Sequence, residues 1–146
     1  MPTPSSNSPL SGDESFPTPP ATLERGINEF NSGAFYACHD TLEAIWMEAD
    51  TSEKPFYQGI LQISVAFYHL GNLNWRGGAI LMGEGISRLG RFEPSYLNVQ
   101  VDDLVDQAVE WLELIQSAGP EGLAAMMKDL PRPLPQIHLT CAPASN

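Results

Sequence analysis

Basic residues are scarce in this chain, which has 7 lysines and arginines against 18 aspartates and glutamates among 146 residues. The formal net charge of −11 argues against duplex nucleic acid or an anionic membrane as the main partner, because both require a basic surface. Long apolar runs are also lacking: the most apolar stretch, residues 59–75, is interrupted by Gln62, His69 and two asparagines. We therefore expect no nucleic-acid partner and no membrane-spanning helix.

Cysteine is nearly absent, and its two occurrences are Cys38 and Cys141. Two cysteines do not build a disulfide framework, and such usage is typical of a reducing cytosol. Cys38 precedes His39, which would suit a nucleophile. Neighbouring helical residues point about 100° apart, however, and a free cysteine usually packs as a small apolar side chain. The first twenty residues have neither a basic start nor an apolar run, so we expect no secretory signal and a cytoplasmic location.

The remaining composition, with 42% hydrophobic and 17% charged residues, is typical of a globular protein. Residues 1–20 are rich in Pro, Ser and Thr, which favours a disordered arm, and residues 131–146 favour a proline-rich extended tail. Between them, residues 21–130 suit one folded domain. We expect an all-α fold, a compact bundle of about five helices with disordered N- and C-terminal tails.

Apolar side chains recur at helical spacing through the folded part. The pattern predicts helices over residues 23–30, 34–49, 53–72, 75–90 and 101–117, with a short sixth helix over 120–129. No segment of consequence alternates with period two, so we expect no sheet. The fourth helix contains four glycines, each of which would cost roughly 1 kcal/mol against alanine. They are Gly77, Gly78, Gly83 and Gly85, and they imply a bend or the close approach of another backbone.

An imidazole and a carboxylate lie four residues apart in the second helix, at His39 and Glu43. His39 lies on an apolar helical face, so we expect it to be buried and to need a polar partner. That face consists of Phe35, His39, Leu42 and Trp46. The third helix carries two further polar residues on one face, Gln62 and His69. If the two helices pack antiparallel, these residues converge with His39 and Glu43.

Three interpretations of this polar cluster stay open. The first is a hydrogen-bonded network that fixes helix register, and the second is a small-molecule pocket without metal. The third is a divalent metal site, because imidazole and carboxylate suit zinc, manganese or iron and three protein ligands leave a position open for water. The metal ligands would then be His39, Glu43 and His69. The candidate general bases are Asp40 and Glu84, and the candidate substrate contacts are Gln62, Asn72 and Arg76.

A competing hypothesis is a non-enzymatic helical module whose polar centre is structural. Its exposed aromatic residues would contact a partner protein or a second copy of the chain, and Trp75 with the glycine-rich fourth helix would be natural interface elements. We expect the large aromatic side chains of this region to be core or interface residues rather than ligand-stacking ones. They are Trp46, Phe67, Tyr68 and Trp75.

The segments FNSGAFYACHDTLEAIW and FYQGILQISVAFYHLGNLNWRGGAILMGEGISRL resemble domain-of-unknown-function family 309 (DUF309), whose members are small and all-helical. The family motif runs FN-x-G-x-[FY]-[FY]-x-[AC]-H-[ED]-x-LE-x-x-W, followed by a GL-[IL]-Q helix that reads GILQ here and by an N-x-x-G-A segment. The resemblance covers residues 21–117, and the sequence of these segments looks like that of the cyanobacterial branch of the family. The matching positions include Phe30, Asn31, Gly33, His39, Asp40, Leu42, Glu43, Trp46, Gly59, Gln62, Asn74 and Ala79.

DUF309 proteins are generally labelled predicted metal-dependent hydrolases. The resemblance therefore implies a hydrolase that uses a divalent metal, with an unknown small molecule or protein as its partner. It points to the polar residues His39, Glu43, Gln62 and His69 as the site. This chain has Asp40 where the family often has glutamate, which puts in doubt any role that needs the longer carboxylate.

Overall fold

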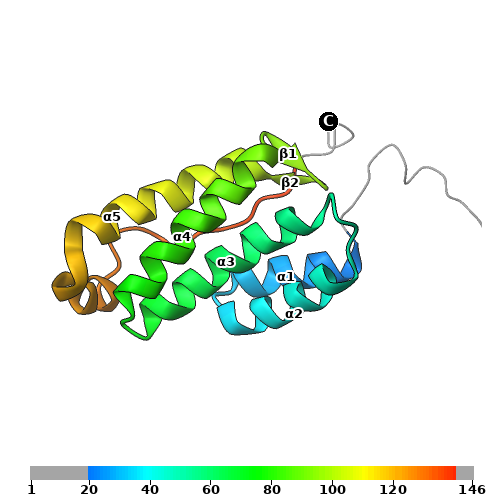
Figure 1. Cartoon of the computed structure of the whole chain (residues 1–146). Helices are drawn as coiled ribbons and strands as arrows, with labels where there is room; N and C mark the ends of the chain where they lie inside the picture. Colours follow the sequence, from blue (N-terminus) through cyan, green and yellow to red (C-terminus); the bar gives the residue numbers. More distant parts are fainter. Residues whose placement is uncertain (1–19, 141–146) are drawn as a thin grey trace, which may run out of the picture.

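A computed structural model describes residues 20–140 as a bundle of five α-helices (Figure 1). The all-α fold class is confirmed. The expected N-terminal arm lies almost wholly outside the described residues, as does the end of the chain after residue 140. The helices are α1 (Ala21–Asn31), α2 (Phe35–Glu48), α3 (Lys54–Gly71), α4 (Trp75–Leu89) and α5 (Val101–Lys128), with a 3-10 turn at Gly90–Phe92.

One local feature differs from the predictions. A two-stranded antiparallel hairpin joins α4 to α5, formed by β1 (Ser95–Tyr96) and β2 (Val99–Gln100). Strands of two residues are too short to show a period-two pattern, so the expectation of no sheet was wrong in this detail. The predicted fifth and sixth helices are the two helical segments of α5, separated by non-helical backbone at Gly119 (φ 70°, ψ 173°) just before Pro120.

Helix α3 is the central element, packed against α2, α4 and α5. It runs antiparallel to α2, and two contacts set their register: the ring of Phe35 stacks on Phe67 at 5.3 Å, and the Ser64 hydroxyl lies 3.2 Å from the Cys38 sulfur. The near-continuous apolar character of α3 explains its position, because such a helix has no face suited to water.

The contact between α3 and α4 depends on small residues. A Cβ added at Gly85 would lie 2.9 Å from the carbonyl oxygen of Gly59, and one added at Gly78 would lie 3.3 Å from the carbonyl oxygen of Ala66. The close backbone approach expected for the α4 glycines is therefore present at Gly78 and Gly85. Gly83 has no atom within 4 Å of an added Cβ, so packing does not require glycine there.

Residues 131–140 run extended along the bundle and are tied to it by hydrogen bonds. Asn31, at the end of α1, donates to the carbonyl of Ile137 (2.9 Å) and accepts from its amide (2.6 Å). Gln107 of α5 makes the same reciprocal pair with Gln136. We call residues 131–140 the strap; its proline-rich composition predicted an extended shape but not this docking.

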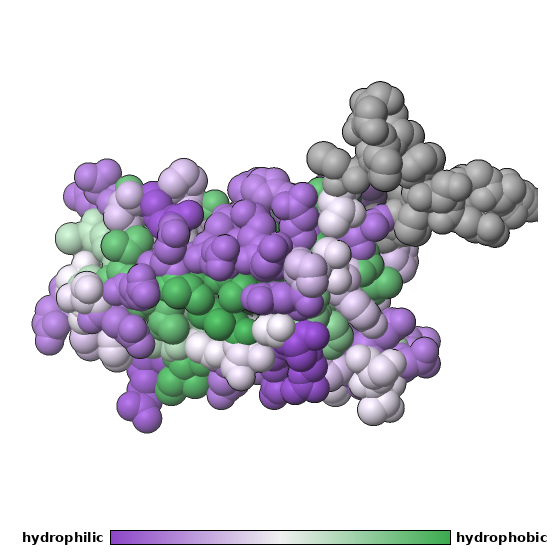
Figure 2. Space-filling model, turned by 90° about the horizontal axis from the view of Figure 1, so that it is seen from above, coloured by the Kyte–Doolittle hydropathy of each residue, from purple (hydrophilic) through white to green (hydrophobic). Residues whose placement is uncertain are grey.

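Figure 2 shows the face over α4 and α5, where an apolar band is bordered by polar side chains.

None of the helices in the described part of the chain combines the length and apolarity that a bilayer crossing needs. Large apolar side chains are also exposed on the surface, among them Met47 (68% exposed), Tyr36 (57%) and Leu73 (55%).

Candidate functional site

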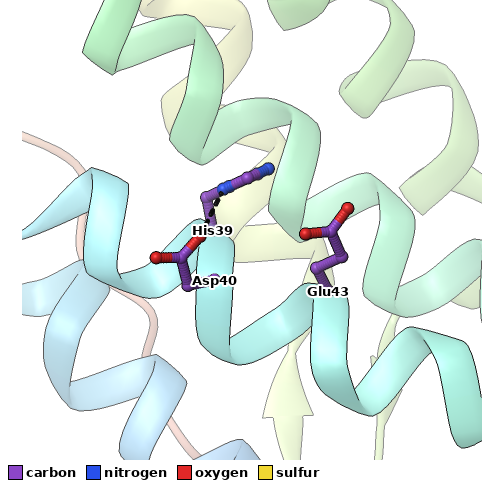
Figure 3. Close-up of side chains that lie close together, drawn as sticks. All are labelled: His39, Asp40 and Glu43. Carbon is purple, nitrogen blue, oxygen red and sulfur yellow. Dashed lines mark hydrogen bonds and ion pairs between the residues drawn. The ribbon is translucent and has the colours of Figure 1, made fainter.

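The candidate site is a group of three side chains on α2: His39, Asp40 and Glu43 (Figure 3). One ligand atom from each residue lies within 4.8 Å of the other two. The i, i+4 spacing puts His39 and Glu43 on one side of the helix, and both side chains extend toward α3 in Figure 3. The group is therefore a product of local helix geometry, and tertiary packing determines how much of it water reaches.

His39 is partly exposed rather than buried, which corrects the expectation from its helical face. Its side chain retains 24% of its accessible area, and its Nδ1 lies 3.1 Å from a carboxylate oxygen of Asp40. Asp40 is 62% exposed. The residues expected to converge with His39 were Glu43, Gln62 and His69; its hydrogen bond is instead made to the next residue in the chain.

The donor set of this group fits a divalent cation. One imidazole nitrogen and two carboxylate oxygens suit zinc, manganese or iron. Around a tetrahedral zinc with ligands at ~2.0–2.1 Å, ligand atoms lie about 3.4 Å apart. Modest side-chain rotations would bring the three ligand atoms from within 4.8 Å of one another to that spacing. Asp40 and Glu43 are exposed and can make them.

Of the four polar residues that were expected to converge, His39 and Glu43 lie together, whereas Gln62 and His69 make contacts elsewhere. Gln62 is 7% exposed, and its Nε2 donates to Glu84 of α4 at 3.0 Å. The Oε1 of Gln62 is buried without a hydrogen-bond partner among the described residues. Burying an unpartnered amide oxygen costs free energy, so the hydrogen-bonding capacity of Gln62 is only partly satisfied.

His69 is not a member of the α2 group, although it was a predicted metal ligand. Its Nδ1 lies 3.2 Å from the Nδ2 of Asn74, the residue that caps the N-terminus of α4. The Oδ1 of Asn74 accepts the amide of Gly77 at 3.0 Å, which leaves its NH2 group to face His69. An NH2 group only donates, so His69 must present the lone pair of Nδ1 and, when neutral, carry its proton on Nε2.

The other two predicted substrate contacts lie at the corner between α3 and α4. Asn72 is exposed directly after α3, and Arg76 is exposed in the first turn of α4. Neither side chain makes a hydrogen bond or ion pair with the α2 group, whose one such contact among the described residues joins His39 to Asp40.

Cys38 is fully buried, as its interpretation as an apolar side chain requires. Burial raises the pKa of its thiol to about 12, against a smaller lowering by the hydrogen bond from Ser64. A thiol with that pKa is almost entirely protonated at neutral pH, and nucleophilic chemistry needs the thiolate. Cys38 therefore belongs to the core of the α2–α3 contact.

Two side chains beside the site were not predicted as part of it. Tyr36 lies one turn before His39, with ring centroids 5.6 Å apart, and its ring is 5.2 Å from that of Tyr68. Tyr68 was expected in a core or an interface, yet 42% of it is exposed. A tyrosine at i−3 from a candidate ligand was the one available signal, since helical residues three apart are neighbours.

The model of DUF309, a domain of unknown function, matches residues 23–81, so this segment of the chain is similar to that family. No curated protein and no solved structure matches the chain.

The DUF309 match runs from α1 into α4 and contains the whole α2 group. It also contains the pair formed by His69 and Asn74, so both polar contacts lie within the family segment. Glu84, Arg88 and all of α5 lie beyond the matched residues, and for them the resemblance over residues 82–117 stays a prediction.

Proposed function

We propose that the DUF309 domain of this chain binds a divalent metal ion through His39, Asp40 and Glu43 and acts as a metal-dependent hydrolase. The observation that carries the proposal is the convergence of the three ligand atoms within 4.8 Å on one side of α2. Three protein ligands on an exposed helix leave coordination positions open to water and substrate. A bound zinc, manganese or iron would lower the pKa of a coordinated water and polarise a substrate oxygen.

The side chains around the group have distinct proposed roles. His39 holds its imidazole against the Asp40 carboxylate, a contact that a metal ion would replace with bonds to both residues. With Asp40 used as a ligand, Glu84 is the proposed general base, and it is already held by the Gln62 amide. Gln62, Asn72 and Arg76 remain proposed substrate contacts.

Elemental analysis of protein purified without a histidine tag tests this proposal. We expect close to one zinc, manganese or iron per chain, and loss of that metal in His39→Ala and Glu43→Gln. Glu48→Gln is the matched control, because Glu48 is another exposed glutamate on α2 that lies outside the group. Protein that stays metal-free after incubation with each ion, or metal that survives both substitutions, contradicts the proposal.

A second candidate function is a helical interaction module. It is favoured by exposed apolar side chains on three different elements: Met47 on α2, Leu73 after α3 and Ile80 on α4. A homodimer or a protein partner would cover them. Light scattering across a concentration series distinguishes the two functions, since a dimer that dissociates in Ile80→Glu while the metal content is unchanged supports an interface apart from the α2 group.

A further inference from the structure

A small pocket lies beside the metal group, between α2 and α3, with a volume of about 220 Å³. The residues that line it are Tyr36, His39, Val65, Tyr68 and His69. His39 is shared between this pocket and the proposed metal group. Whatever binds in the pocket therefore lies next to the group where chemistry is proposed.

The walls of this pocket are aromatic. Tyr36 and Tyr68 come from different helices and lie 5.2 Å apart at an interplanar angle of 45°, while Tyr36 also lies 5.6 Å from His39. Tyr36 is 57% exposed and Tyr68 is 42% exposed. Because these rings are largely exposed to solvent, their burial contributes little to the stability of the fold. Their exposed faces can stack on a planar ligand.

His69 gives the pocket one directional polar group. Because Asn74 donates to its Nδ1, the neutral ring carries its proton on Nε2, at the opposite edge of the imidazole. Among the described residues, Nε2 of His69 has no hydrogen-bond partner. The pocket thus offers a donor and no fixed acceptor for it.

We propose that this pocket binds a neutral, planar aromatic ring that carries a hydrogen-bond acceptor. The ring packs on the exposed faces of the Tyr36 and Tyr68 rings, and its acceptor receives a hydrogen bond from the N–H of His69 Nε2. The volume is below the ~300–1,000 Å³ of sites for drug-sized ligands, so it suits a single ring system. No lysine or arginine lines it, which disfavours an anionic ligand.

In the context of the proposed hydrolase, the bound ring is the part of the substrate nearest the metal. That assignment rests on the proposed function, whereas ring binding itself does not. Binding is therefore measured in EDTA, without metal. A domain that binds the ring but no metal loses only the hydrolase proposal, and one that binds metal but no ring loses only the pocket proposal.

Two probes that differ only in the ring test the aromatic requirement. Benzamide is planar and carries a carbonyl acceptor, and cyclohexanecarboxamide carries the same amide on a saturated ring. We expect benzamide to shift the ring NMR signals of Tyr36 and Tyr68 saturably, with cyclohexanecarboxamide at least about tenfold weaker. Shifts that do not saturate up to the solubility limit, or equal binding of the two probes, overturn the proposal.

Substitutions test the residues. Tyr36→Leu and Tyr68→Leu each remove one aromatic face that contacts the ligand, and each should weaken benzamide binding about fivefold or more. Met47→Leu is the control, because Met47 is an exposed residue of α2 outside the pocket. Unchanged benzamide binding in both tyrosine variants overturns the proposal.

Asn74→Asp tests the donor without removing the helix cap, since aspartate caps as well as asparagine. A carboxylate only accepts, so it draws the His69 proton to Nδ1 and leaves Nε2 as an acceptor. At pH 8.5 we expect Nδ1 of His69 in the variant to show the ¹⁵N chemical shift of a protonated ring nitrogen and Nε2 that of an unprotonated one, the reverse of wild type. Benzamide should bind the variant about three- to tenfold more weakly, which is the effect expected from losing one hydrogen bond. A wild-type His69 with its proton on Nδ1, or unchanged binding in Asn74→Asp, overturns the donor role.

Discussion

Gly85 of α4 packs directly on Gly59 of α3: a Cβ at Gly85 would lie 2.9 Å from the Gly59 carbonyl oxygen and 2.7 Å from Cγ1 of Ile63. The backbone oxygen cannot rotate away as a side chain can, so the two helices must separate to admit a methyl group. This contact sets the distance between α3 and α4, and with it the positions of Glu84 and Asn74 relative to α3.

We expect Gly85→Ala to lower the free energy of unfolding by about 1–3 kcal/mol, the cost of overpacking a well-packed contact. Gly83→Ala is the matched control on the same helix, where an added Cβ meets nothing within 4 Å. That control should raise stability by about 0.5–1 kcal/mol, because alanine has the higher helix propensity. Urea unfolding of both variants measures the difference, and equal effects of the two substitutions contradict the packing argument.

The strap depends on Asn31, whose side chain makes two hydrogen bonds with the backbone of Ile137. Asn31→Ala leaves that amide and carbonyl without partners, so we expect a loss of about 1–3 kcal/mol. Asn28→Ala, at an exposed position of the same helix, should change stability by less than about 0.5 kcal/mol. Hydrogen exchange supplies a second readout: the amide of Ile137 should lose protection in Asn31→Ala and keep it in Asn28→Ala.

The thiol of Cys38 should be unreactive in the folded protein. Burial raises its pKa to about 12 from an ordinary value of 9.0, and the side chain is fully enclosed. In a Cys141→Ser background, we expect iodoacetamide at pH 8 to leave the native chain unmodified and to alkylate it once in denaturant. Mass spectrometry measures the mass added by alkylation. Rapid alkylation of the native protein would show that the Cys38 thiol is exposed and would contradict this prediction.

Stability should fall at alkaline pH, partly through Tyr57. Burial raises the pKa of this phenol to about 12 from an ordinary value of 10.0, and the nearby Glu53 carboxylate adds to the rise. The folded state then holds the proton more tightly than the unfolded state. The resulting stabilisation is complete below pH 10 and is lost as the pH rises toward 12.

Urea midpoints measured between pH 9 and 12 test the Tyr57 contribution. The decline should be shallower in Tyr57→Phe than in wild type, because that variant has no phenol to ionise. Tyr36→Phe changes an exposed tyrosine and should keep the wild-type decline. Some decline should persist in Tyr57→Phe, because burial also raises the pKa of Cys38 and that of Tyr96.

Much of the fold could be predicted from the sequence, but only part of the candidate site could. The helices were predicted because periodicity, capping and turn signals are properties of residues within about ten positions of each other. His39 and Glu43 were found for the same reason, since one turn of helix brings them together. His69 was assigned to the same group on the assumption that helix centres face each other, but the structure pairs it with Asn74.

Residues that act across helices left little trace in the sequence. Asn31 lies at the end of α1, and nothing in the sequence indicates that it also binds the strap some hundred residues later in the chain. Tyr36 and Tyr68 read as ordinary aromatic residues. Their pairing depends on the register of α2 against α3, which is set by contacts such as Phe35 on Phe67.

By itself, the sequence determined the all-helical class, the approximate ends of the helices, the DUF309 segment and the local group on α2, because each depends on short-range spacing or on a linear motif. Only the tertiary structure decided which polar side chains share a site, what fraction of the His39 side chain is exposed, and which nitrogen of His69 faces Asn74. These follow from helix register and separation, which glycine contacts and aromatic stacking fix between residues far apart in the chain.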